Sequence, residues 1–199
     1  MFFFTFVFLL SCGIDNLSNS NLKIINGLHV NKENEIYKSL VFFSTSERPE
    51  EPFCSGSIIS KSFVLTAAHC LNDRNIKEIL LTIPSSNFEK FKLKSINLFS
   101  DEKKFYPVFD IAVAELSSQI TDKSFPVELF DGENNIEDVS DIVITGFGMT
   151  NLNVNSFEKK PYHTFSKFDH LFKNGPLRNL FTTNSDKGQS ICHGDSGGG

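Results

Sequence analysis

Short apolar or alternating runs, separated by polar turns, fill this sequence from Ile24 onwards. None of these runs keeps the period of an amphipathic helix over several turns. Many short strands with frequent turns are typical of all-β sandwiches and barrels, and a chain of 199 residues has the length for a pair of small barrels. We therefore predict an all-β fold, with strands at Leu40–Phe43, Gly56–Ile59, Phe63–Leu65, Ile79–Ile83, Phe91–Phe99, Ile111–Leu116 and Asp141–Thr145.

The stretch from Asn151 to Gly188 lacks this pattern. It contains Pro161, a Gly175-Pro176 pair and scattered phenylalanines, which are signals for turns and loops. We expect it to be irregular and assign it no chemistry. Its histidines, His163 and His170, are interpreted as ordinary surface or packing residues.

The overall composition excludes several classes of protein. Hydrophobic residues make up 40% of the chain, which supplies a buried core and excludes a disordered or collagen-like chain. There are 19 Lys and Arg against 24 Asp and Glu, for a formal net charge of −5. Because no basic stripe is present to neutralise a phosphate backbone, nucleic acid is not an expected partner.

The N-terminus carries an apolar run, Phe2–Leu10, that is too short to span a bilayer but suits a secretory signal. Residues 1–12 are therefore predicted to be a signal peptide and the mature chain to be exported. The run ends in Leu-Leu-Ser-Cys-Gly, which is similar to a bacterial lipobox with Cys12 as the lipidated residue; the alternative is an ordinary signal with a chance cysteine. Residues 13–23 are polar and are expected to form a linker or pro-segment.

Four cysteines stand at positions 12, 54, 70 and 192. Cys54 and Cys70 lie in neighbouring strand-like stretches and are natural disulfide partners in an oxidising compartment. Metal binding is the competing interpretation, because His69-Cys70 and Cys192-His193 are adjacent soft ligands. No Cys-x-x-Cys or His-x-x-x-His spacing supports it, so no metal is expected.

A serine near the end of the sequence stands in the glycine-rich string Gly194–Gly199, where the backbone can approach a ligand closely. Ser196 is a candidate nucleophile, although such a string also suits a plain turn. A serine hydroxyl needs an imidazole to remove its proton, and the imidazole needs a carboxylate to hold its tautomer. The sequence offers His69 at the end of one predicted strand and Asp110 at the start of another.

The strings Thr-Ala-Ala-His-Cys ending at Cys70, Asp-Ile-Ala starting at Asp110 and Gly-Asp-Ser-Gly-Gly around Ser196 stand in the order His, Asp, Ser. Together they resemble the chymotrypsin/trypsin-like serine peptidase family. The resemblance covers residues 24–199 and implies a peptidase domain with a double β-barrel. It implies Ser196 as nucleophile, His69 as base and then acid, and Asp110 as the group that orients His69.

Further strings carry the resemblance to other parts of the family's pattern. Lys23-Ile24 looks like the activation site, where cleavage would free the α-amino group of Ile24 to pair with Asp195. This pairing implies an oxyanion hole formed by the backbone N–H groups of Gly194 and Ser196.

Two more elements match the family. Cys54 and Cys70 match the bridge that closes the loop carrying the catalytic histidine. The string Thr145–Gly148 is similar to the Gly-Trp-Gly strand end that opens the second barrel, with Phe in place of Trp.

The sequence also departs from the family. Family members continue past the Gly-Asp-Ser-Gly-Gly string with the last strands of the second barrel, whereas this sequence stops at Gly199. We expect an incomplete second barrel, a fragment of a longer product, and an unpaired Cys192, whose family partner lies in the missing part. Ser190 aligns with the floor of the specificity pocket, and its neutral side chain favours large apolar groups at the cleavage point.

The function expected from the resemblance is that of a serine endopeptidase made as a zymogen and either secreted or lipid-anchored at the cell surface or periplasm. Its partners would be protein or peptide substrates and an activating protease, with a membrane tether through Cys12 as an addition; neither metal nor organic cofactor is implied. The alternatives are an inactive protease homologue or fragment that binds partners, and a surface lipoprotein with a structural role.

Overall fold

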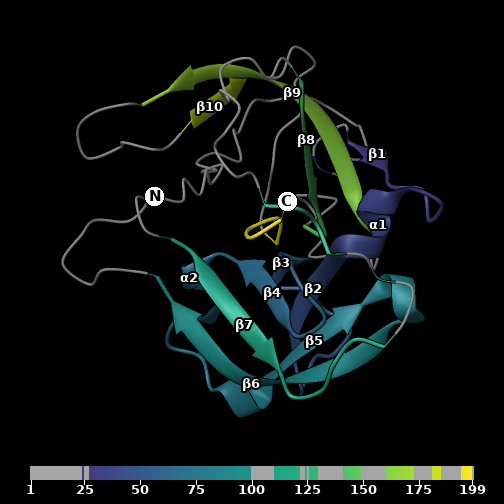
Figure 1. Ribbon diagram of the computed structural model, residues 1–199, viewed down its shortest axis with the longest axis vertical. Helices are drawn as coiled ribbons and strands as arrows, with labels where there is room; N and C mark the ends of the chain where they lie inside the picture. Colours follow the sequence, from purple (N-terminus) through teal and green to yellow (C-terminus); the bar gives the residue numbers. More distant parts are fainter. Residues whose placement is uncertain are drawn as a thin grey trace, which may run out of the picture.

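A closed barrel of six antiparallel strands forms the first half of the protein (Figure 1). Its strands follow one another around the barrel in the order β2-β3-β4-β7-β6-β5. They are β2 (Leu40–Thr45), β3 (Cys54–Ile58), β4 (Phe63–Thr66), β5 (Ile79–Ile83), β6 (Glu89–Leu98) and β7 (Ala112–Leu116). The computed structural model describes residues 24, 27–99, 110–121, 124, 126–129, 141–148, 160–172, 181–184 and 194–198.

Alternation of apolar and polar residues explains why these segments form a barrel. On β6, Phe91 and Leu93 are buried while the lysines between and beside them are exposed, so one face of the strand packs inward. Gly56 lets strands approach closely, because a Cβ there would lie 2.9 Å from the Phe43 ring. The interior is filled by apolar side chains: Val41, Phe43, Ile58, Val64, Ile79, Leu81, Ile83, Phe91, Leu93, Ala112, Ala114 and Leu116.

A second sheet of four strands is built around β9, which pairs antiparallel with the other three. Strand β8 pairs with β9 from Asp141↔Lys167 to Gly146↔Tyr162. Strand β10 pairs with the far end of β9, with a register shift between Thr182 and Thr183. The four strands are β1 (Leu28–His29), β8 (Asp141–Gly146), β9 (Tyr162–Leu171) and β10 (Phe181–Asn184).

The helices in the described part of the chain are short. Helix α1 begins after Asn34, whose side-chain oxygen accepts the N–H of Ile36 at 3.0 Å and caps the first turn. None of the described helices is long and apolar enough to cross a membrane. The helical segments are α1 (Glu35–Ser39), α2 (Ala68–Leu71), η1 (Ile76–Glu78) and η2 (Pro84–Ser86).

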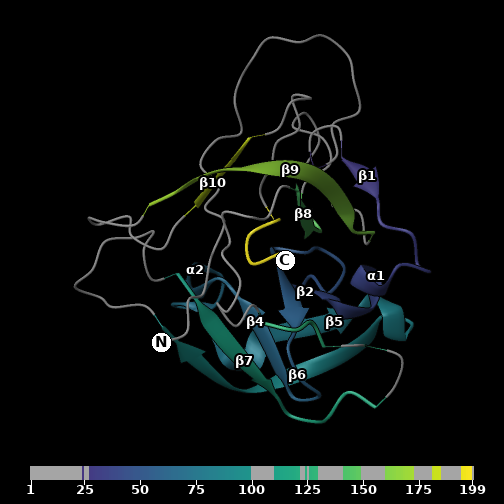
Figure 2. The same ribbon diagram turned by 45° about the horizontal axis from the view of Figure 1, so that its top comes forward.

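A small apolar cluster joins the barrel to the second sheet. The rings of Phe42 on β2 and Phe147 just after β8 lie 5.2 Å apart, and both are buried. Val30, Tyr37 and Leu40 complete the cluster. In Figures 1 and 2 the segment Gly194–Gly198, drawn in yellow, lies between the barrel and the second sheet. The last described residues therefore sit where the two halves of the fold meet.

The all-β prediction is confirmed, and each of the seven predicted runs overlaps a strand. The prediction that residues 151–188 are irregular is wrong, because β9 and β10 both lie in this stretch. The side chains that β9 buries are Tyr162, Thr164 and Ser166, whereas Phe165 is 55% exposed. The usual alternation is therefore reversed over Thr164–Ser166, in the middle of the strand, and this hides β9 from a search for alternating hydrophobic residues.

Candidate active site

His69 lies in the single turn of helix α2, which begins directly after strand β4. Ala67 and Ala68, where the chain passes from β4 into α2, are both buried, so small side chains pack at this turn. The His69 side chain is 38% exposed. More than a third of this side chain is therefore open to solvent.

Asp110 lies just before strand β7 and is 5% exposed. Strands β4 and β7 are paired, with Thr66 opposite Ala112, so the residues before β7 and the residues after β4 meet at one end of the barrel. Asp110 Oδ2 lies 2.6 Å from His69 Nδ1, and Oδ1 accepts the backbone N–H of His69 at 2.7 Å. With Nδ1 bonded to a carboxylate, the neutral ring carries its proton there and presents Nε2 as the basic atom.

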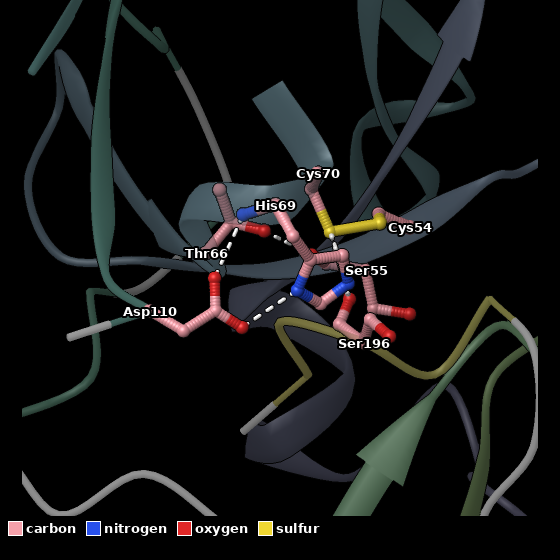
Figure 3. Close-up of polar contacts among 7 residues, drawn as sticks. All are labelled: Cys54, Ser55, Thr66, His69, Cys70, Asp110 and Ser196. Carbon is pink, nitrogen blue, oxygen red and sulfur yellow. Dashed lines mark hydrogen bonds and ion pairs between the residues drawn. A yellow bond between two sulfur atoms is a disulfide. The ribbon is translucent and has the colours of Figure 1, made fainter. Parts of the chain in front are cut away.

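Ser196 lies on the opposite side of the imidazole from Asp110 (Figure 3). Cys70 Sγ lies 3.7 Å from His69 Nε2 and 3.7 Å from the Ser196 carbonyl oxygen, so it contacts both residues. The structure thus brings the three predicted residues to one place, with the imidazole between the carboxylate and the serine.

The turn that carries Ser196 has a tightly defined backbone. Gly194 and Gly197 have φ angles of 93° and 77°, values that L side chains rarely adopt. A Cβ at Gly197 would also overlap the Thr66 hydroxyl. Across the turn, the N–H of Gly198 donates to the Asp195 carbonyl at 2.9 Å. The glycines on both sides of Ser196 are therefore needed for the shape of the turn and not only for its flexibility.

Asp195 is 2% exposed and packs against the end of β8. Its Oδ1 accepts the N–H of Gly148 at 2.7 Å, and a Cβ on either Gly146 or Gly148 would overlap its carboxylate. The sequence analysis identified these two glycines only as part of a strand end similar to Gly-Trp-Gly, and it predicted no contact between them and Asp195. Ile24, the residue expected to supply the activating amine, is also buried, at 1% exposed.

Two further residues of the site were missed by the sequence analysis. Ser55 is fully buried, and it makes hydrogen bonds to both Gly194 and Ser196. Thr66 donates its hydroxyl to the Ser55 carbonyl at 2.8 Å. No signal in the sequence marks either residue, because their partners are main-chain atoms or residues distant in sequence.

The predicted disulfide between Cys54 and Cys70 is present, with the Cα atoms 6.1 Å apart. It joins β3 to the helix that carries His69. The potential ligand atoms of Cys54, His69 and Cys70 lie within 4.8 Å of one another, but the two sulfur atoms are bonded in the disulfide and offer no thiolate to a metal.

Several predicted residues lie outside the described part of the chain. They are Cys12, Lys23, Ser190 and Cys192, together with the signal and linker segments at 1–12 and 13–23. The predictions made for them stay predictions.

Comparison with known proteins identifies the family to which the chain belongs. The family model for trypsin matches residues 24–199. The chain is 25% identical to hypodermin-A of Hypoderma lineatum over 195 residues, which cover 92% of this chain and 74% of that protein. It is 24% identical to mouse (Mus musculus) tissue-type plasminogen activator over 217 residues, 94% of this chain and 39% of that protein. A match to hypodermin-B, at 27% identity, covers 55% of this chain and 42% of that protein. The chain belongs to the trypsin family of serine proteases.

Proposed function

We propose that this chain is a serine endopeptidase that hydrolyses peptide bonds through His69, Asp110 and Ser196. The observation that carries this proposal is the pair of contacts from Asp110 to His69, with Ser196 on the other side of the same ring. This arrangement fits a base whose tautomer is fixed by a carboxylate and whose second nitrogen faces a hydroxyl.

The proposed reaction begins with attack of Ser196 Oγ on the peptide carbonyl, while His69 Nε2 takes the hydroxyl proton. The imidazolium then lies 2.6 Å from the Asp110 carboxylate, which stabilises its charge. The backbone N–H groups of Gly194 and Ser196 would bind the oxyanion. His69 next gives its proton to the leaving amine, which leaves an ester on Ser196 Oγ. Water then attacks the ester carbonyl while His69 Nε2 takes a proton from it, and His69 returns this proton to Ser196 Oγ as the ester bond breaks and the acid product leaves.

We propose that the enzyme is made as a zymogen and activated by cleavage after Lys23. The new α-amino group of Ile24 would pair with Asp195, which the burial of both residues supports. A buried carboxylate is stabilised by charge pairing as well as by hydrogen bonds, so a cation beside Asp195 would add to the bond that it accepts from the Gly148 N–H. The ion pair would fix the turn that contains Gly194 and Ser196.

A fluorophosphonate probe tests the catalytic proposal, because it reacts with an activated serine and not with an ordinary one. We expect labelling of the cleaved wild-type protein, and none of the Ser196→Ala variant or of the chain left intact at Lys23. His69→Ala should reduce labelling strongly. Absence of labelling in folded, cleaved wild-type protein would instead support an inactive homologue that binds partners.

We also propose a preference for large apolar side chains at the cleavage point and an extracytoplasmic location. The first rests on the neutral Ser190 and is tested with paired peptide substrates that carry Phe or Arg before the scissile bond. The second is supported by the Cys54–Cys70 disulfide, which forms and persists in oxidising compartments. A Cys12→Ala variant that leaves the membrane fraction would assign the tether to a lipid on Cys12.

A further inference from the structure

Ser55 lies at the point where the barrel, the second sheet and the turn carrying Ser196 meet. It is on β3 opposite Phe42, so its side chain lies on the strand face that looks away from the barrel interior and toward Phe147. The residue is 0% exposed. A hydroxyl buried this completely needs hydrogen-bond partners, and those partners show what it holds.

The Ser55 hydroxyl bonds to two main-chain groups from different parts of the fold. It donates to the Gly194 carbonyl at 2.8 Å and accepts the N–H of Phe147 at 2.9 Å. A serine has one proton to donate, and here the carbonyl of Gly194 receives it. The hydroxyl therefore links the end of β8 to the start of the turn carrying Ser196.

The main chain of Ser55 holds the same turn at a second point. Its N–H donates to the Ser196 carbonyl at 2.8 Å, and its own carbonyl accepts the Thr66 hydroxyl at 2.8 Å. Two carbonyls of the turn, those of Gly194 and Ser196, thus point at one residue of β3. Because a peptide group is planar, each of these bonds fixes the plane of the peptide that follows the carbonyl.

The peptide between these two is held as well, and its orientation decides where the N–H of Ser196 points. The Asp195 carbonyl accepts the N–H of Gly198 at 2.9 Å. In a trans peptide the C=O and N–H point in opposite directions, so the N–H of Ser196 is directed away from Gly198. Three successive peptide planes of the turn are fixed in this way, and Ser55 provides two of the three contacts.

We infer that Ser55 is a positioning residue: its hydroxyl holds the Gly194–Asp195 peptide, which adjoins the peptide that carries the Ser196 N–H, and so keeps that N–H in the orientation that binds an oxyanion. This inference rests on the proposed function. Through the Phe147 N–H, the same hydroxyl also links the turn to the residue that follows β8.

The decisive variant is Ser55→Ala, which removes the hydroxyl but keeps both main-chain hydrogen bonds. Ser57→Ala is a matched control, because Ser57 is a buried serine on the same strand and the same face, two positions along. Ser55→Thr tests rescue because it restores a hydroxyl. If the Ser55→Ala protein does not fold, Ser55→Gly takes its place, because it also removes the hydroxyl.

The first measurements are kcat and KM of the cleaved protein, with the active sites counted by fluorophosphonate titration so that kcat refers to active enzyme. The second is the affinity for a peptide aldehyde, whose hemiacetal oxygen occupies the oxyanion position. We expect Ser55→Ala to lower kcat by about 10- to 100-fold, less than loss of a whole oxyanion donor. Its KM should stay close to that of the wild type, and aldehyde affinity should fall in parallel with kcat. Ser57→Ala should behave as the wild type, and Ser55→Thr should recover most of the loss.

The outcomes separate this inference from the proposed function. If Ser196→Ala and His69→Ala are as active as the wild type, the proposed function itself fails. If those variants are inactive while Ser55→Ala keeps wild-type kcat per titrated site and wild-type aldehyde affinity, the inference about Ser55 is overturned. A lower melting temperature without those kinetic changes would also overturn it, because it would assign Ser55 to stability alone.

Discussion

A single carboxylate, that of Asp110, holds His69 at two points. Oδ2 lies 2.6 Å from the ring Nδ1, and Oδ1 accepts the backbone N–H of the same histidine at 2.7 Å. The first contact sets the rotation of the ring and its tautomer, while the second fixes the main chain from which the ring extends. Because Asp110 is 5% exposed, water does not compete strongly for either contact.

Asp110→Asn should lower kcat by about four orders of magnitude while the fold is retained. The Asn oxygen can still accept the His69 backbone N–H, but its NH₂ group would face Nδ1 and would favour the tautomer with the proton on Nε2. Nε2 could then no longer accept the Ser196 proton. Steady-state kinetics and a melting curve on the same preparation test this. An Asn variant within tenfold of the wild-type kcat would contradict the proposed role.

Loss of the disulfide should destabilise the barrel. The double variant Cys54→Ala/Cys70→Ala opens a bridge between residues 16 positions apart. We expect a loss of about 3 kcal/mol in the free energy of unfolding, because a bridge of this span restricts the unfolded chain. For a chain of this size that corresponds to a fall of about 6–12 °C in Tm. Wild-type protein treated with a strong reductant is the control, and its Tm should equal that of the double variant. Equal Tm values for the oxidised and the reduced wild-type protein would refute the prediction.

Gly148→Ala should displace Asp195. The added Cβ would overlap the Asp195 carboxylate, which also accepts the Gly148 N–H at 2.7 Å. We expect a stability loss of about 1–3 kcal/mol from overpacking, together with weaker fluorophosphonate labelling, since Asp195 adjoins Ser196 in the turn. Ser118→Ala, a change at an exposed position, controls for the effect of substitution itself. Unchanged labelling and stability would show that the carboxylate does not need this close approach.

Acid should weaken the second sheet through His163. Burial lowers the pKa of this side chain, and the nearby charge of His29 lowers it further. Its Nδ1 is buried and has no hydrogen-bond partner among the described residues. A lowered pKa in the folded state means that the unfolded chain binds the proton first, so stability should fall as pH drops below the unfolded value of about 6.5. The loss should be complete once pH is below the folded pKa.

Denaturant midpoints measured between pH 8 and pH 5 test this dependence. His163→Gln should flatten the acid side of the curve, whereas His170→Gln, an exposed position on the same strand, should leave its shape unchanged. An acid dependence that is identical in wild-type and His163→Gln proteins would place its origin in other groups.

The barrel and the His–Asp pair could be predicted from sequence because local patterns encode them. Each barrel strand carries an apolar run of its own, and the strings around His69 and Asp110 stand next to strands that pair with each other. Strand β9 could not be predicted this way, because it buries Thr164 and Ser166 and exposes Phe165. Its position is fixed by pairing with β1, β8 and β10, and pairing leaves no periodic signal in β9 itself.

The role of Ser55 was hidden for a different reason. Its hydroxyl reaches a main-chain carbonyl 139 residues away, and a carbonyl has the same chemistry whichever side chain accompanies it. The glycines at 146 and 148 are similar, since the sequence marks them as a strand end and only the fold brings Asp195 against them. Contacts to backbone atoms over such distances appear only once the chain is folded.

The order of the segments along the chain has a consequence for the cell that makes this protein. All six barrel strands precede residue 117, whereas Ser196 lies 126 residues after Cys70, the neighbour of His69. Chains generally fold from the N-terminus during synthesis, so the imidazole and its carboxylate can meet while the serine is still untranslated. On the proposed function, a nascent chain that holds only the barrel has a base with no hydroxyl to activate. On the proposed function, the order of synthesis therefore completes the catalytic site last, and this delay is separate from any control by cleavage at Lys23.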